Sequence, residues 1–211
     1  MAREAVINSV LSEQGYSRVS SMLFRLTNSN DDVEHLFSYS FWGADRAALR
    51  CDFGFLNNKA EDFAIRCVRL YGGPVYRHSK WSYYTMSFSF GKLAGWDPRS
   101  SLWFPMSDDV LAERVRTGLQ TKLFPLIKNA SDLKGLFCLL CTDVEPFRWL
   151  YVNGAIRVAQ ICWLAKKMHL DDKQMYELIS SYKAELGASL VRGIEPQEYI
   201  TNIIAEVEKP D

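Results

Sequence analysis

The hydrophobic pattern of this chain changes its period near Pro105, and this change limits the folds that the chain can adopt. Before Pro105, apolar and polar residues alternate along several short runs, which is the period-two pattern of half-buried strands. After Pro105, apolar residues recur every three or four positions, as in amphipathic helices. Strands collected early and helices collected late favour an α+β fold over a doubly wound parallel sheet.

Period-two runs predict four strands, and a short apolar run before Pro105 adds a fifth. The five runs span residues 21–27, 33–41, 49–55, 82–90 and 102–104. In the third run, Cys51 and Phe53 flank the charged Asp52, so one face of the strand is apolar. Clusters of Asn, Asp and Gly separate the first three runs and indicate turns. We therefore expect an antiparallel four- or five-stranded sheet in the N-terminal half, packed with helices.

Helical periods predict a helix over 2–14, a second over 59–71 and five more after Pro105, which make the C-terminal half all-helical. The helix over 147–169 is apolar nearly all round, so it should be the central buried one. Asp171 and Gln174 have the spacing of a capping box, which marks a helix start. The chain is predicted to form a single domain over 1–211, in which a sheet-rich region over 1–105 and a helical region over 106–211 share one core.

The composition argues against several classes of function. The 25 Lys and Arg residues balance the 25 Asp and Glu residues, so net charge gives no reason to expect nucleic acid or an acidic membrane as partner. The N-terminus lacks the apolar core of a signal peptide, and no apolar run is long enough for a transmembrane helix. Five cysteines, an odd number, lie within apolar patterns. Reduced thiols and a cytoplasmic location are therefore expected.

No motif predicts catalysis, a metal site or a cofactor. Cys138 and Cys141 have CxxC spacing, but a zinc site needs two more ligands at comparable spacing. Their apolar helical surroundings instead predict buried structural thiols. Of the three histidines, His35 is predicted to be half-buried and hydrogen-bonded, and His169 to lie in the last turn of a helix. His78 alone lies in a loop, without an identifiable partner, so the chain is not predicted to be an enzyme.

The most informative cluster for function combines basic and aromatic residues between Arg66 and Arg99, against one acidic residue, Asp97. Such a combination is typical of single-stranded nucleic-acid sites and of protein interfaces, where Arg, Trp and Tyr dominate the binding energy. A third interpretation is that the charges are only solvated and the tryptophans cover sheet edges. The sequence lacks an RNA-recognition pattern, which favours a protein interface. The predicted contact residues are Arg77, His78, Lys80, Trp81, Tyr83 and Trp96.

Four segments resemble small bacterial α+β proteins of unassigned function. They read "SEQGYSRVSSMLFRL", "VEHLFSYSFWG", "LRCDFGFLN" and "WSYYTMSFSFGKL". In such families the strands follow a helix that ends at a glycine and a following aromatic residue. Some members serve as immunity proteins beside contact-delivered toxins. The resemblance covers about half of the chain and implies no catalytic residues.

We therefore expect a protein-binding module, with an immunity or accessory protein that neutralises a toxin by direct binding as the leading hypothesis. The second hypothesis is a nucleic-acid-associated protein that uses the same basic and aromatic residues. The third is an enzyme whose site is assembled from distant residues, such as His78 and a carboxylate.

Overall fold

The computed structural model describes residues 2–26, 32–43, 46–72, 85–96, 101–142 and 154–209. The chain packs into two compact units, which are described one at a time. The sheet unit consists of Met1–Phe55, Ser87–Asp132 and Asp143–Leu150, and the helical unit of Leu56–Met86, Leu133–Thr142 and Tyr151–Asp211. Pro105 lies inside the sheet unit and does not separate the two units. The single domain with a shared core stays a prediction.

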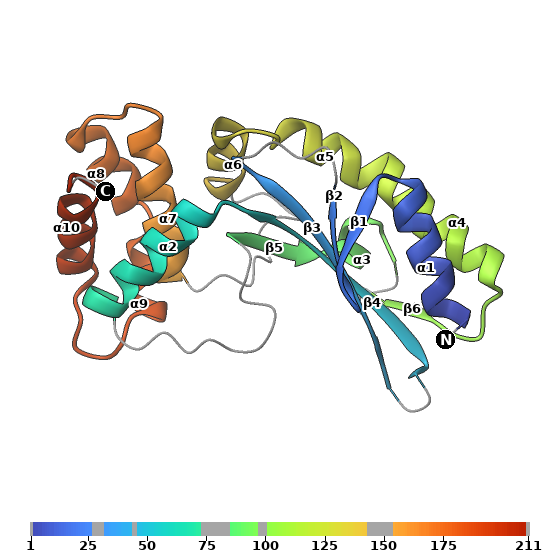
Figure 1. Cartoon of the computed structure of the whole chain (residues 1–211). Helices are drawn as coiled ribbons and strands as arrows, with labels where there is room; N and C mark the ends of the chain where they lie inside the picture. Colours follow the sequence, from blue (N-terminus) through green and yellow to red (C-terminus); the bar gives the residue numbers. More distant parts are fainter. Residues whose placement is uncertain are drawn as a thin grey trace. The chain divides into compact units, whose positions relative to one another are not determined.

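The predicted α+β class is confirmed, because an antiparallel sheet forms in the N-terminal half and helices dominate the C-terminal half (Figure 1). Within the described residues the sheet has six strands, which are β1 Tyr16–Ser20, β2 Leu23–Leu26, β3 Glu34–Trp42, β4 Ala48–Leu56, β5 Met86–Ser89 and β6 Ser101–Trp103. Their order is β1-β2-β3-β4-β5, and β6 pairs with β4.

One strand that was not predicted and one strand end that differs from the prediction have local explanations. The first strand, β1, was not predicted because only Tyr16 of its five residues is buried, which leaves no alternation to detect. The strand predicted over 82–90 ends at Ser89, and its residues 82–84 lie outside the described part of the chain. The Ser89 hydroxyl accepts a hydrogen bond from the Lys92 N–H, which starts the short helix α3, Phe90–Leu93.

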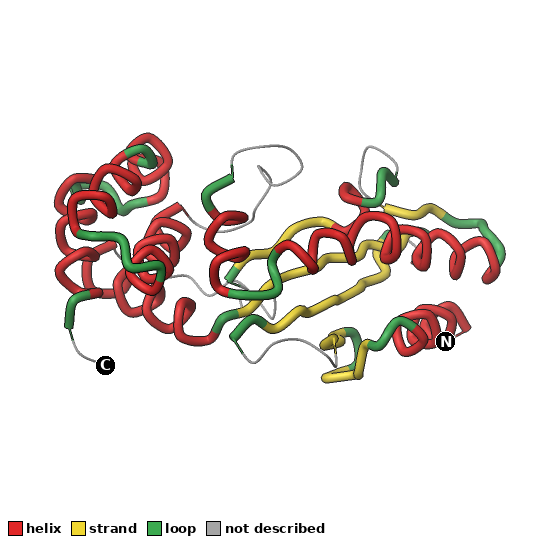
Figure 2. Tube along the Cα trace, turned by 90° about the horizontal axis from the view of Figure 1, so that it is seen from above, coloured by secondary structure: helices red, strands yellow, loops and turns green. Residues whose placement is uncertain are grey.

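One face of the sheet carries the core of the sheet unit. Phe24 of β2 is paired with Phe37 of β3, and the Phe37 ring meets the Phe90 ring edge-on at 5.0 Å. Helices α1, Ala2–Glu13, and α4, Asp108–Gly118, cover this face. Tyr39 donates a hydrogen bond to Asn8 of α1, and α4 approaches Phe90 at Gly118. Figure 2 shows the helical segment that begins with α4 running along the strands.

The helical segment that begins with α4 runs past Pro125 without leaving a helical conformation. A π-helical turn, η3 Leu119–Leu123, leads directly into α5, Phe124–Asn129. Pro125 lies at the start of α5, directly after the π-helical turn, a position at which helices tolerate proline.

The helical unit is organised around α7, Gly154–Lys167, which is buried along nearly its whole length as predicted. The surrounding elements are α2 Asn58–Cys67, the π-helical turn η2 Val68–Gly72, α6 Leu133–Leu140, α8 Asp172–Ser180, α9 Lys183–Ser189 and α10 Pro196–Val207. The capping box of α8 is confirmed, with the Gln174 N–H donating to the Asp171 carboxylate at 2.8 Å. None of the described helices is long and apolar enough to cross a membrane.

His35 is more deeply buried than predicted. Its side chain is only 1% exposed, its ring lies 5.2 Å from that of Phe55, and neither ring nitrogen has a hydrogen-bond partner of ordinary geometry. Burial lowers the pKa of His35, and a contact with the Ala130 backbone offsets this only in part. A neutral imidazole therefore fits the core, whereas the protonated ring does not.

This burial predicts that acid destabilises the protein through His35. Because the pKa is lower in the folded state than in the unfolded state, His35 costs no stability above its unfolded pKa of about 6.5. Below that pH the unfolded chain takes up the proton first, and stability falls. We expect His35→Leu to remove part of this loss in urea titrations between about pH 7.5 and 4.5. His169→Asn is the control, since it removes an exposed histidine at a left-handed φ of 60° that Asn tolerates. If the free energy of unfolding falls by the same amount with pH in wild type and in His35→Leu, the prediction is contradicted.

Candidate functional site

Of the six predicted contact residues, only Trp96 belongs to the described part of the chain. Arg77, His78, Lys80, Trp81 and Tyr83 lie outside it, so their grouping stays a prediction. Trp96 is half-buried, and its ring meets the Phe90 ring edge-on at 5.3 Å. Its backbone N–H donates to the Gly91 carbonyl at 2.8 Å. Trp96 therefore fixes the end of α3 within the sheet unit.

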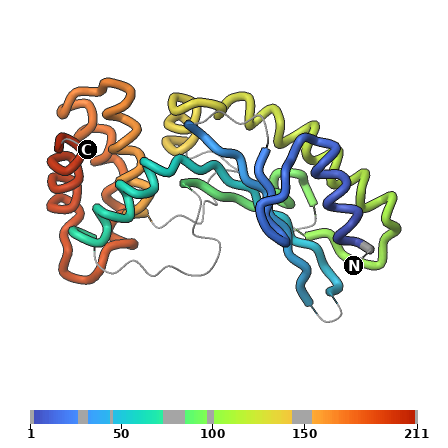
Figure 3. The backbone as a smooth tube through the Cα atoms, viewed as in Figure 1, coloured from blue at the N-terminus to red at the C-terminus, as the bar shows by residue number. Residues whose placement is uncertain are grey.

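A different aromatic and basic group lies at the end of the hairpin formed by β3 and β4, which runs past β1 and β2 (Figure 3). We call it the hairpin cluster. Its members are Arg3, Phe41, Trp42, Arg46, Trp103 and Phe104. It forms because β6 pairs with β4, with Trp103 opposite Ala48, so the end of β6 reaches the end of the hairpin.

Trp42 and Trp103 form one side of the hairpin cluster. Their ring centroids are 5.1 Å apart and their planes make an angle of 70°, an edge-to-face contact. The Trp42 indole N–H donates to the Ser101 hydroxyl at 3.3 Å, which fixes the orientation of the ring. Trp42 nevertheless remains 39% exposed, so a rigidly held indole surface faces solvent.

The other side of the hairpin cluster combines phenylalanine rings with guanidinium groups. Phe41 and Phe104 lie 6.3 Å apart. The Arg3 guanidinium carbon is 3.7 Å from the centre of the Phe104 ring, and that of Arg46 is 4.4 Å from the centre of the Phe41 ring. Both distances are in the range of cation–π contacts. Arg3 has no carboxylate partner among the residues that the structure describes.

Arg46 holds the hairpin cluster against α1. Its φ of 57° places a non-glycine residue in the left-handed region, which costs about 1 kcal/mol. From this position its side chain reaches both the Phe41 ring and the Glu4 carboxylate, with which it forms an ion pair. This hydrogen-bonded pair lowers the pKa of Glu4. The charge of Arg46 is thus balanced locally by Glu4.

The sequence contains a signal for the hairpin cluster that the period-based reasoning missed. Two aromatic pairs, Phe41-Trp42 and Trp103-Phe104, occupy the ends of two strands. Neighbouring residues of a strand point to opposite faces, so such pairs make both faces of a strand end aromatic. Only the pairing of β6 with β4, a contact between distant segments, brings the two pairs together.

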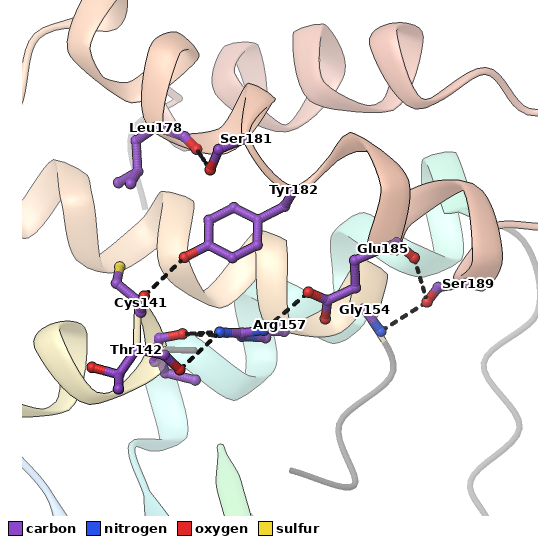
Figure 4. A network of polar contacts seen from close by, with 10 residues as sticks. Cys141, Thr142, Gly154, Arg157, Leu178, Ser181, Tyr182, Glu185 and Ser189 are labelled. Carbon is purple, nitrogen blue, oxygen red and sulfur yellow. Dashed lines mark hydrogen bonds and ion pairs between the residues drawn. The ribbon is translucent and has the colours of Figure 1, made fainter. Parts of the chain in front are cut away.

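The helical unit contains a polar network centred on Arg157, a residue that sequence reasoning did not single out (Figure 4). Arg157 is 8% exposed, and its guanidinium donates to the Leu140 carbonyl at 2.6 and 3.0 Å and to the Glu185 carboxylate at 2.9 Å. Tyr182 lies against the guanidinium and donates to the Cys141 carbonyl at 3.3 Å. The network joins the end of α6 to α7 and α9, and all of these contacts are structural.

The predicted burial of Cys138 and Cys141 is wrong. Cys138 is exposed and Cys141 is half-buried, whereas Cys51, Cys67 and Cys162 are fully buried. The error arose because α6 is apolar in composition but lies with one side toward solvent. Among the residues that the structure describes, no three His, Cys, Asp or Glu side chains are placed to hold a metal ion.

Comparison of the chain with protein-family models, with curated proteins and with solved structures returns no match.

Proposed function

We propose that this chain is a cytoplasmic protein-binding module whose partner docks on the hairpin cluster. The observation that carries the proposal is the exposed indole of Trp42, which is oriented by Ser101 and supported by Trp103. Interfaces draw most of their energy from a few aromatic and arginine side chains that are already rigid before binding. Arg77, His78, Lys80, Trp81 and Tyr83 are proposed as a second set of contacts.

The chemistry of the hairpin cluster defines the surface that the partner should present. An exposed indole favours an apolar pocket, and Arg3, which has no carboxylate partner among the described residues, favours an acidic group where the partner reaches the Phe104 side of the strand end. We therefore propose a folded protein with an apolar pocket and an acidic rim. The resemblance to immunity proteins makes a toxin the partner class to test first.

The experiment compares two aromatic residues of equal exposure in the two units. Trp42 and Tyr176 are each 39% exposed. Proteins captured by the wild-type chain from its source cells are purified, and their affinities are measured for wild type, Trp42→Ala and Tyr176→Ala. We expect Trp42→Ala to weaken binding by about 30-fold, the effect of a 2 kcal/mol contact, and Tyr176→Ala to leave it unchanged. Equal affinities for wild type and Trp42→Ala would remove the hairpin cluster from the proposal.

Salt dependence separates this proposal from the nucleic-acid alternative. A complex that depends on phosphate contacts weakens steeply as salt concentration rises, because bound counterions are released. A complex anchored by Trp42 with one carboxylate contact should weaken only slightly. Two results together would favour a nucleic-acid-associated protein. Nucleic acid would copurify with the chain and be lost at high salt, and Trp42→Ala would capture the same proteins as the wild type.

A further inference from the structure

The pair Cys138 and Cys141 offers chemistry that the proposed function does not use. Helix α6 ends at Leu140, but its hydrogen-bond pattern continues through the second cysteine, whose N–H donates to the Phe137 carbonyl at 3.0 Å. Residues three apart in an α-helix lie on the same side of it, with Cα atoms about 5 Å apart. This separation is within the range of 4.4–6.8 Å, roughly, that a disulfide requires.

The two thiols differ in exposure, which assigns them different roles. Cys138 faces solvent and is open to a small oxidant, whereas Cys141 is half-buried beside it. The pairing of an accessible cysteine with a nearby second thiol is the arrangement in which an oxidised cysteine is converted to a disulfide. The other three cysteines are fully buried, and burial raises the pKa of each thiol, in the case of Cys67 to about 12. They are therefore protected from the same oxidant.

We infer that Cys138 and Cys141 form a reversible intramolecular disulfide when the protein meets a hydroperoxide. The Cys138 thiolate attacks one peroxide oxygen, the O–O bond breaks, the other oxygen takes up a proton and leaves as an alcohol or water, and Cys138 becomes a sulfenic acid. The Cys141 thiol then attacks the Cys138 sulfur, the S–O bond breaks, and the oxygen leaves as water with the thiol proton. Two thiols are oxidised and one hydroperoxide is reduced.

The surroundings of the pair make this disulfide easy to reduce. The Cβ atoms of residues three apart in a helix are about 5–6 Å apart, whereas a disulfide needs about 3.5–4.5 Å. The helix end must therefore shift, and its carbonyls are held by Arg157 at Leu140 and by Tyr182 at Cys141. A strained disulfide has a more oxidising potential and returns readily to the dithiol.

Peptide mass spectrometry of the native full chain tests the inference. Trypsin releases residues 135–148, which contain Cys138 and Cys141 as their only cysteines. After treatment with hydrogen peroxide, we expect this peptide to lose the mass of two hydrogen atoms and to regain it with dithiothreitol. Peptides that contain Cys51, Cys67 or Cys162 should remain reduced. Cys138 is exposed and Cys141 only half-buried, so serine variants at these positions should keep the wild-type circular dichroism.

The serine variants distinguish the two roles. In Cys141→Ser, the sulfenic acid of Cys138 has no second thiol, so labelling of Cys138 by dimedone should rise several-fold over wild type. In Cys138→Ser, Cys141 should stay reduced under the same conditions. The inference is overturned if wild type and Cys141→Ser label equally, if Cys138 proceeds to a sulfinic acid without forming the disulfide, or if oxidation joins two chains on a non-reducing gel.

Discussion

Replacing Arg157 with methionine is expected to lower the free energy of unfolding by about 3 kcal/mol, mainly because a buried carbonyl acceptor loses its donors, with a smaller part from the half-exposed Glu185 carboxylate. The change leaves the Glu185 carboxylate without its cation and the Leu140 carbonyl without its donors, which are 2.6 and 3.0 Å away in the wild type. Methionine fills most of the volume of the apolar part of the arginine side chain. The decrease in the free energy of unfolding therefore comes mainly from the lost polar contacts. A urea titration followed by circular dichroism should show a midpoint lowered by about 1 M.

Two further variants make the Arg157 experiment decisive. Arg157→Lys keeps the charge but cannot donate to Leu140 and Glu185 in the same forked geometry, so it should recover only a small part of the loss. Arg116 also bridges two acidic residues, Glu13 and Glu113, but on the surface of the sheet unit. Arg116→Met should have a much smaller effect, because water replaces exposed ionic contacts. Similar losses for Arg157→Met and Arg116→Met would show that the buried network does not stabilise the fold as described.

Gly154→Ala is expected to destabilise the protein by about 2 kcal/mol, although alanine is normally the better helix residue. A Cβ atom at position 154 would lie 2.6 Å from the Ser189 hydroxyl oxygen and 2.7 Å from Cγ of Glu185. It would also lie 3.0 Å from the Glu185 backbone oxygen, which cannot move without displacing α9. The same shift would strain the hydrogen bond from the Gly154 N–H to Ser189, now 3.0 Å long.

Gly187 provides a matched control with the opposite expected sign. It lies in α9, and a Cβ atom there would meet only Cγ of Pro196, at an ordinary 3.9 Å. Gly187→Ala should therefore stabilise the protein by up to about 1 kcal/mol, the usual helical gain over glycine. Thermal unfolding of both variants gives the comparison. Two alanine variants that change stability in the same direction would contradict the close approach of α7 and α9 at Gly154.

The features of the fold that were predicted are those encoded over short distances in the sequence. Strand β4 was predicted because Cys51 and Phe53 alternate with Asp52, and α8 because Asp171 and Gln174 form its capping box. Helix α9 was missed, since apolar positions continue to Tyr182 and conceal the turn at Ser181-Tyr182 that separates α8 from α9. No local pattern marks such an interruption when the flanking residues keep a helical period.

Side-chain clusters proved harder to predict, because they depend on contacts between distant segments. The hairpin cluster requires β6 to pair with β4, which brings Trp103 beside Trp42. The buried role of Arg157 requires α9 to place Glu185 within 2.9 Å. A period of two or 3.6 reports which face of an element is buried, but it does not report what that face meets. The proposed contacts around Trp81 stay a prediction for the same reason.

The interleaving of the two units has a consequence for how the protein is made. The sheet strands, α1 and α3 to α5 all precede residue 133, so these elements can begin to pack while the chain is still being synthesised. Helix α2 must instead wait for α7, since Gln160 contacts Glu61 from 99 residues further along the chain. Until α7 has been synthesised, the apolar side of α2 lacks the helix against which it packs in the folded protein. The newly made chain should therefore depend on chaperones until α7 leaves the ribosome, and nascent chains that stop before Gly154 should be the first to aggregate.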